Sequence, residues 1–335
     1  MKSHARKLWD LYFHGILLAV LVALAARFIG EHYAVPSMLF ALLAGMALSQ
    51  IYNQPPLKSG IDLSSSFFLR LGVGLMGAGL SFNQLSSLGL LPVLGALGVT
   101  GLALLIGLLL ARLFGRTSAF GILAAGSVAI CGAAAALAIS TILPKSGKLE
   151  RNTLFVVVTV TALSTVAMIV YPILFKVLGF DDEQLGFLIG ATIHDVAQVV
   201  GAGYSVSDEA GLTATFIKML RVALLPVVVF FAALTLSVGN GQKMHLPGLP
   251  WFLIMFIFFA VLGVLNWIPA FAKELILSIG KMLLLIAIAA IGMKVDLKEM
   301  LDVHPNSFLL VLSNTLIIAA LAVGFLMLFW IPVST

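Results

Sequence analysis

Three polar residues, His194, Asp195 and Gln198, interrupt an apolar stretch in the segment GATIHDVAQVVGAG, residues 190–203. Asp195 lies deeper inside a hydrophobic run than any other acidic residue of the chain. An ionisable side chain at bilayer depth costs roughly 2.5–3.5 kcal/mol on insertion scales, so it usually faces a cavity and serves ion or substrate movement. We therefore expect His194 and Asp195 to act as an ion-coupling or gating pair. A buried polar pair that pins one helix to its neighbours is the structural alternative.

Gln198 follows His194 by four residues and therefore shares its helix face. Gly190, Gly201 and Gly203 bracket the three polar residues, so the backbone can unwind there. We expect Gln198 to contribute to a substrate-binding site.

A second interruption by small residues lies in AAGSVAICGAAAA, residues 124–136. A helix broken at this point exposes backbone N–H groups at mid-membrane, and such helix ends bind anions. On this reading Ser127, Cys131 and Gly132 line a substrate site. Close helix packing, which small residues permit, explains the same pattern and stays open.

Two cations, Lys218 and Arg221, lie three residues apart on one helical face of KMLRVALLPVVVF, residues 218–230. The fork of an arginine suits sulfate, sulfonate, phosphate or carboxylate oxygens. We expect the pair to hold an anionic substrate or to neutralise Asp195. Snorkelling to the lipid head groups is the alternative.

Other chemistry is poorly supported by the sequence. Cys131 is the only cysteine, and no second His or Cys lies at ligand spacing from His194, so we expect no metal site and no cofactor. A Gly-rich phosphate loop and a serine nucleophile elbow are also absent. The hydroxyl row Thr159, Thr161, Ser164 and Thr165 most often signals bonds to backbone or neighbouring helices, and a pore lining is the alternative.

The elements that must position these residues are membrane helices. Of the 335 residues only 10% are charged, and the mean hydropathy is +1.15. The net charge of +5 is assigned to loop anchors at the membrane surface rather than to nucleic-acid binding. We predict a single all-α integral membrane domain over residues 1–335, with about 10–11 transmembrane helices and a plasma (inner) membrane location. Eleven apolar runs carry this prediction: residues 12–29, 36–52, 67–83, 88–113, 118–143, 152–178, 184–204, 211–238, 249–269, 273–293 and 305–331.

A weak internal repeat relates residues 70–85 to residues 289–300. In both, a helix of small residues ends in glycine, hydrophobe, polar residue, hydrophobe and Asn or Asp. The two runs are third and tenth in order, so single crossings run in opposite directions, as an inverted repeat requires. The sequence leaves open whether runs 118–143 and 184–204 cross fully or re-enter, and which way the chain is oriented.

These motifs resemble those of a known family. GxSxxICGAxA at 126–136, IGATIHDVAQVVGAG at 189–203, the Lys218/Arg221 pair and LRLGVGLMGAGLS at 69–81 are similar to the YeiH-type putative sulfate exporter family. The resemblance covers nearly the whole chain. It extends to the bile acid/arsenite/riboflavin transporter superfamily, which implies secondary transport through inverted repeats with broken, crossing helices. It also implies that Ser127, Cys131 and Gly132 lie in one broken helix, facing a polar site at His194, Asp195 and Gln198.

We therefore expect a secondary transporter of a small anion such as sulfate or a sulfonate, coupled to H⁺ or Na⁺, and not an enzyme. Its expected partners are the substrate, the coupling ion and membrane lipid, without nucleic acid, and a homo-oligomer stays open. The alternatives are a sodium-coupled carrier of a neutral or cationic solute, a channel, and an intramembrane acid–base enzyme.

Overall fold

The computed structural model describes residues 2–33, 37–80, 82, 89–144, 148–236, 250–295 and 305–330, which are helical almost throughout. The first part of the chain contains α1 (Lys2–Tyr33), α2 (Ser37–Ala47), α3 (Pro55–Leu63), α4 (Leu69–Met76), α6 (Leu91–Leu113), α7 (Ser118–Ala129) and α8 (Ala133–Ser140). The second part contains α9 (Leu149–Val177), α10 (Asp182–Thr192), α11 (Val196–Val206), α12 (Asp208–Ala223), α13 (Leu225–Leu236), α14 (Trp251–Val264), α15 (Ala270–Lys294) and α16 (Pro305–Phe325).

Seven helices in the described part of the chain are long and apolar enough to cross a membrane. They are Leu11–His32, Pro55–Gly79, Leu91–Leu113, Arg151–Val177, Asp208–Ala232, Ala270–Lys294 and Pro305–Trp330. Together with the shorter apolar helices α2, α7, α11 and α14, they place one such helix in each of the eleven predicted runs. The prediction of an all-helical polytopic membrane protein is therefore confirmed.

The surface of α6 shows how the bundle divides its residues between protein and lipid. Leu102, Leu105, Leu109 and Leu113 recur every three or four residues and are all at least half exposed. The opposite face buries small residues such as Gly107 and Ala111. An exposed leucine stripe of this length would be unfavourable in water but suits a helix whose outer face contacts lipid.

One predicted boundary is wrong. The third run was expected to begin at residue 67, but the helix begins at Pro55 and continues through a π-helical turn, Ser64–Phe68, to Gly79. Proline is well tolerated in the first helical turn, where its missing N–H has no partner to lose. The polar residues between 58 and 66 resemble a loop, but Asp62 and Ser65 have partners on α15.

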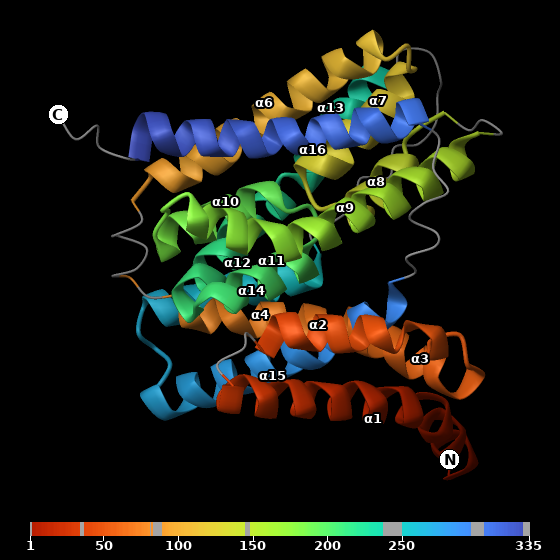
Figure 1. The fold of residues 1–335 in the computed structure, drawn as a ribbon, viewed down its shortest axis with the longest axis vertical. Helices are drawn as coiled ribbons and strands as arrows, with labels where there is room; N and C mark the ends of the chain where they lie inside the picture. Colours follow the sequence, from red (N-terminus) through yellow and green to blue (C-terminus); the bar gives the residue numbers. More distant parts are fainter. Residues whose placement is uncertain are drawn as a thin grey trace.

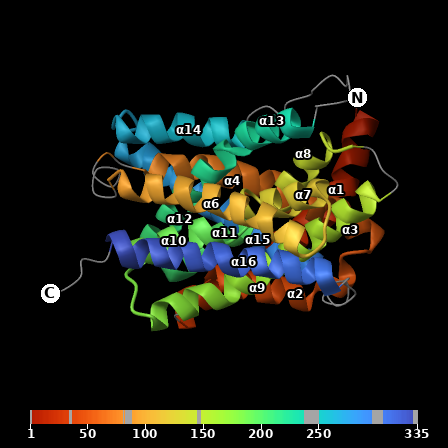
Figure 2. The ribbon, with the colours of Figure 1, turned by 90° about the horizontal axis from the view of Figure 1, so that it is seen from above.

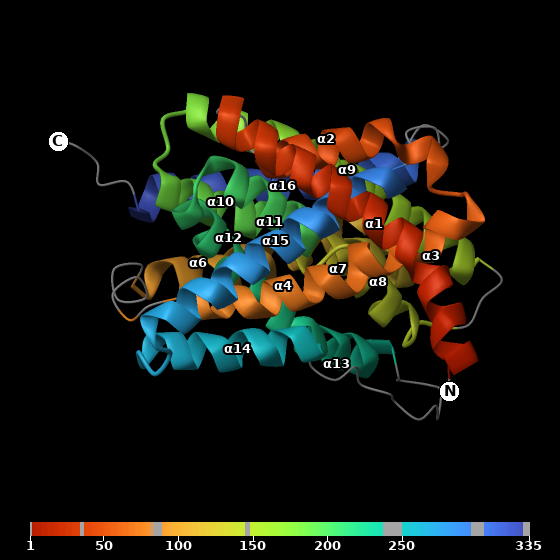
Figure 3. The same ribbon diagram turned by 90° about the horizontal axis from the view of Figure 1, so that it is seen from below.

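The helices form two groups that meet at α11. In the first group, α1 packs on α2 and α3, while α15 packs on α2 and α4, and α14 packs on α4. In the second group, α6 packs on α7 and α16, and α12 packs on α10 and α11. Figure 1 shows α6 and α16 at one side of the bundle, α1 and α15 at the other, and α8–α12 between them. Figures 2 and 3 show α13 and α14 along one edge and α2 and α9 along the opposite edge.

The predicted repeat lies partly outside the described residues, at 81, 83–85 and 296–300. Its described parts lie on α4 and α15, which pack against each other so closely that a Cβ added at Gly72 would lie 2.9 Å from Leu284 Cγ. The repeat stays a prediction.

Candidate functional site

Two helices are interrupted in the interior of the bundle. The first breaks between α7 and α8, over Ile130–Gly132, and the second between α10 and α11, over Ile193–Asp195. Gly132 adopts φ +64°, a left-handed conformation that L side chains rarely take. A Cβ at Gly132 would lie 3.6 Å from the backbone carbon of His194 and 3.7 Å from the nitrogen of Asp195. The two breaks therefore lie against each other, although they are about sixty residues apart in sequence.

Each break leaves one helix end with free carbonyls, and two buried cations bind both of these ends. Lys218 Nζ donates to the carbonyl of Ile130 at 2.7 Å, to that of Ile193 at 2.9 Å and to that of His194. It therefore bridges the end of α7 and the end of α10.

Arg221 repeats this bridge one helical turn later on α12. Its Nε and Nη2 donate to the carbonyls of Ala129 at 2.9 Å and Val128 at 3.0 Å. Its Nη1 donates to the carbonyls of Gly190 at 2.9 Å and Ile193 at 3.2 Å. Arg221 and Lys218 are both 0% exposed. A helix carries about half a negative charge at its C-terminal end, so the two cations neutralise two converging negative ends.

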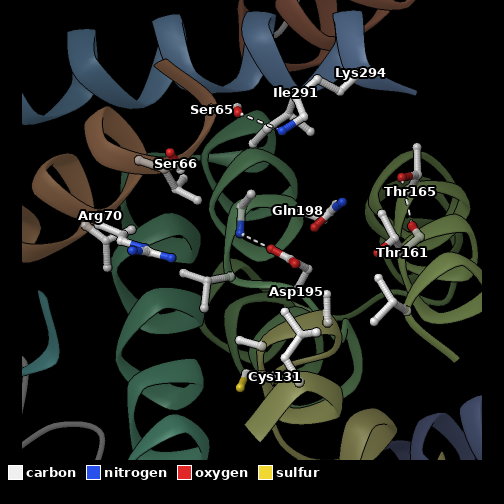
Figure 4. Close-up of a pocket in the computed structure, with 18 of the residues that line it drawn as sticks. Ser65, Ser66, Arg70, Cys131, Thr161, Thr165, Asp195, Gln198, Ile291 and Lys294 are labelled. Atoms are coloured by element: carbon white, nitrogen blue, oxygen red, sulfur yellow. Dashed lines mark hydrogen bonds between the residues drawn. The ribbon is translucent and has the colours of Figure 1, made fainter. Parts of the chain in front are cut away.

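The other two helix ends open into a cavity of about 750 Å³. Ala133 and Ala134 at the start of α8 and Val196–Gln198 at the start of α11 line it. Figure 4 shows Asp195, Gln198 and Cys131 around this space. The first N–H groups of a helix have no intrahelical partner and carry about half a positive charge, so both ends suit an anion.

Asp195 caps one of these ends. Its carboxylate accepts from the N–H of Ala197 at 2.9 Å, and its own N–H donates to Ser164 Oγ at 3.1 Å. The carboxylate also lines the cavity, so it can meet a solute or an ion there.

Gln198 is 2% exposed and lines the same cavity, yet its Oε1 has no hydrogen-bond partner among the residues that the structure describes. Buried polar atoms are nearly always paired, and an unpaired one in a binding cavity indicates an absent ligand, ion or water.

His194 is adjacent to Asp195 but does not line the cavity. Its Nδ1 lies 3.1 Å from the carbonyl of Val128, and its Nε2 lies 2.9 Å from Thr315 Oγ1 on α16. Because the backbone at Ile193 and Asp195 is extended, neighbouring side chains point in opposite directions. The imidazole thus connects the two breaks to α16.

The remaining predicted residues divide between the cavity and the helix packing. Cys131 lines the cavity. Ser127 lies within α7, where its hydroxyl donates to the Leu123 carbonyl at 2.5 Å. Of the hydroxyl row, Thr161 and Thr165 line the cavity, whereas Thr159 and Ser164 do not. Lys218 and Arg221 also lie outside the cavity lining, so their placement does not favour the predicted direct contact with substrate.

Sequence reasoning missed two cations of the cavity, Arg70 on α4 and Lys294 at the end of α15. Lys294 forms an ion pair with Asp62 at 2.7 Å. Tyr52 donates to the same carboxylate at 2.9 Å, and burial together with this neighbour raises the pKa of Tyr52 to about 12. Arg70 has no ion pair among the described residues. Its position inside the third apolar run was the available signal.

Within the described residues, no group of three or more His, Cys, Asp and Glu side chains could hold a metal ion. The cavity is lined by the starts of two helices, the acid Asp195, the amide Gln198 and the cations Arg70 and Lys294.

Comparison with known proteins identifies the family. The family model of conserved hypothetical protein 698 matches residues 14–311. The chain is 43% identical to the UPF0324 membrane protein CT0845 of Chlorobaculum tepidum, over 94% of this chain and 89% of the relative. It is 44% identical to the UPF0324 membrane protein TauZ of Paracoccus denitrificans, over 94% and 95% of the two chains. It is 30% identical to the UPF0324 inner membrane protein YeiH of Salmonella typhimurium, over 93% of each.

No solved structure matches the chain. The apolar helices and the inner-membrane relatives agree with the predicted location and with the predicted family. The chain belongs to the UPF0324 family and is a multi-pass inner-membrane protein.

Proposed function

We propose that this protein is a secondary active transporter of a small anion, coupled to H⁺ or Na⁺. One observation carries the proposal: the positive ends of two broken helices open into one cavity, while their negative ends are closed by Lys218 and Arg221. Broken helices with such ends at mid-membrane recur at the binding sites of secondary transporters.

The electrostatics of the four helix ends support an anion. If the two C-terminal ends were open, their partial negative charges would offset the positive ends nearby. Lys218 and Arg221 remove that offset, and Arg70 adds a further positive charge to the cavity wall. The cations of α12 thus act on the anion through the helices, without touching it.

Asp195 is the proposed coupling residue. An ionised carboxylate in the cavity repels an anion, and a bound H⁺ or Na⁺ removes this repulsion. Binding of the coupling ion therefore favours binding of the substrate, which is the thermodynamic requirement for symport. His194 serves as the gating member of the pair, because it joins the breaks to Thr315 on α16.

A carrier is better supported than an intramembrane enzyme. An acid–base pair formed by His194 and Asp195 would need both groups to face a substrate. The imidazole instead bonds Val128 and Thr315 and does not line the cavity.

One observation favours a second cargo class. The carboxylate of Asp195 and the unpaired Oε1 of Gln198 are two oxygens in one cavity, as a sodium-coupled carrier of a neutral or cationic solute would require. Uptake of ²²Na⁺ into proteoliposomes, with and without an added anion, separates the two. Stimulation of ²²Na⁺ uptake by an anion supports the main proposal, and stimulation only by neutral or cationic solutes supports the alternative.

Thermal-shift screening of purified protein against sulfate, thiosulfate, sulfonates and carboxylates tests anion binding itself. We expect at least one oxyanion to stabilise the wild type, and Gln198→Leu to lose this stabilisation. Gln54→Leu is the matched control, because Gln54 is exposed before α3 and does not line the cavity. Stabilisation by none of these anions would contradict the proposal.

A further inference from the structure

Arg70 lines the cavity, and it is unusual because it is a cation well inside a membrane-spanning segment. It lies well inside the membrane-spanning segment Pro55–Gly79, on the turn that follows the π-helical residues Ser64–Phe68. A π-helical turn shifts the register of the residues beyond it and is frequent at functional sites. Ser65, Ser66, Leu69, Arg70 and Val73 consequently share the face that lines the cavity.

The guanidinium of Arg70 has no ion pair or hydrogen bond within the described part of the chain. Figure 4 shows it directed into the cavity, towards Asp195. Lys294, by contrast, already has Asp62 as its partner. Arg70 is therefore the cation that is available to a substrate, and its planar fork suits a carboxylate or sulfonate group.

The rest of the cavity is not built for a small inorganic ion. Its wall is mostly apolar: Leu69, Val73, Leu137, Val157, Val158, Ala162, Val196, Val222, Leu225, Phe252, Ile291 and Val295. An inorganic oxyanion carries charged oxygens on all sides, and oxygens that face such a wall would lose water without gaining hydrogen bonds. The volume of about 750 Å³ also lies in the range of sites for organic ligands.

We propose that the substrate is an organic anion, with one carboxylate or sulfonate headgroup held by Arg70 and an apolar carbon body against the valine and leucine wall. This inference rests on the proposed transport function and narrows its substrate class. The start of α11 and the amide of Gln198 supply the further donors to the headgroup.

An alkanesulfonate series tests the apolar body at constant headgroup. Binding of methane-, butane- and hexanesulfonate and of inorganic sulfate is measured by calorimetry on the protein in nanodiscs. Affinity rises along the series by up to about fourfold for each methylene that becomes buried, and sulfate binds more weakly than hexanesulfonate. Empty nanodiscs correct for partitioning of the sulfonates into lipid.

Two variants test the two halves of the site separately. Arg70→Gln weakens the binding of every sulfonate by about 10- to 100-fold. Arg112→Gln, at the exposed end of α6, leaves the binding unchanged. Ala162→Phe fills part of the space beside the apolar wall. It therefore removes the rise in affinity with chain length and leaves the affinity for methanesulfonate unchanged. Arg70→Lys keeps the positive charge but loses the planar fork, so its affinity for the sulfonates should lie between those of wild type and Arg70→Gln. It replaces Arg70→Gln in the experiment if that variant fails to fold.

The outcomes distinguish the failure of the organic substrate class from the failure of the proposed anion transport. Sulfate binding as tight as that of hexanesulfonate, or an affinity that is independent of chain length, overturns the organic substrate class and leaves anion transport standing. Unchanged binding in Arg70→Gln or Arg70→Lys overturns the role of Arg70. Absence of binding by sulfate and by every sulfonate counts against both the substrate class and the proposed function.

Discussion

Lys218 and Arg221 lie one turn apart on α12, and both donate to the carbonyl of Ile193, at 2.9 Å and 3.2 Å. From this shared atom each cation reaches across to α7 or the residue after it. The two broken helices are thus held at their negative ends by a third helix. This arrangement makes α12 a structural support of the site.

The first prediction concerns Lys218→Met. The variant leaves the carbonyls of Ile130 and His194 without their donor, while Ile193 keeps its bond from Arg221. Each buried carbonyl that loses its partner costs about 1–3 kcal/mol. We expect a clearly lower unfolding temperature in detergent, measured without any ligand.

Lys281→Met is the matched control for that experiment. Lys281 pairs with Asp208 at 2.6 Å on the surface, where both side chains are exposed. Exposed pairs contribute about 0–1 kcal/mol, so the unfolding temperature should hardly move. If Lys218→Met were as stable as Lys281→Met and lost only anion binding, Lys218 would be a substrate ligand, as the sequence first suggested.

The second prediction concerns Gly132→Ala. Gly132 and Gly115 adopt φ +64° and φ +65°, backbone conformations that L side chains rarely take, so alanine costs about 1–3 kcal/mol at either position. Only a Cβ at Gly132 touches the second break, since nothing lies within 4 Å of one at Gly115. We expect Gly132→Ala and Gly115→Ala both to lose stability, but a loss of transport from Gly132→Ala alone. Equal transport rates in the two variants would show that contact between the breaks is unimportant.

The third prediction separates charge from capping at Asp195. Asparagine is as good an N-cap as aspartate, so Asp195→Asn should keep the bond to Ala197 and change stability by less than about 1 kcal/mol. The variant has no charge for H⁺ or Na⁺ to neutralise. We expect exchange of anion across proteoliposomes to persist, and uptake driven by a pH or Na⁺ gradient to disappear.

Asp181→Asn controls for the capping chemistry, because Asp181 caps α10 outside the cavity. Gradient-driven uptake should be unchanged in this variant. Gradient-driven uptake that survives in Asp195→Asn would remove Asp195 from the coupling mechanism.

The fourth prediction tests the link from His194 to α16. Thr315→Val removes the partner of His194 Nε2 and leaves that nitrogen buried and unpaired, at a cost of about 1–3 kcal/mol. Thr100 is a similarly buried helix threonine whose hydroxyl donates to the Ala96 carbonyl, four residues earlier, and to no other described residue. We expect Thr315→Val to lower stability and slow anion exchange, and Thr100→Val to do neither. Identical exchange rates in the two variants would argue against a gating role.

The breaks in the helices could be predicted from sequence because they depend on local residues. Gly132 and the cluster of small residues near it predict an interruption, and the polar residues from His194 to Gln198 predict a second one. The length of the apolar runs predicts the membrane helices for the same reason. Each of these signals lies within the segment whose structure it predicts.

The partners across the fold could not be predicted in this way. Lys218 and Arg221 resemble an anion site in sequence, but their acceptors are carbonyls 24 to 93 residues away. Arg70 was not predicted as a site residue. The third predicted run begins only three residues before it, and a cation so close to a helix end usually snorkels to the head groups. The helix that begins at Pro55 places Arg70 well inside a membrane span.

Counterflow of a radiolabelled anion in proteoliposomes tests carrier-mediated anion transport most directly, because it needs no knowledge of the coupling ion. Vesicles loaded with unlabelled butanesulfonate or sulfate are diluted into a trace of the labelled anion. An anion carrier with Gln198 in its binding site gives transient accumulation of label above its equilibrium level for wild-type protein, and none for Gln198→Leu. Label that only equilibrates, or uptake no greater than in protein-free vesicles for both anions, would contradict an anion carrier.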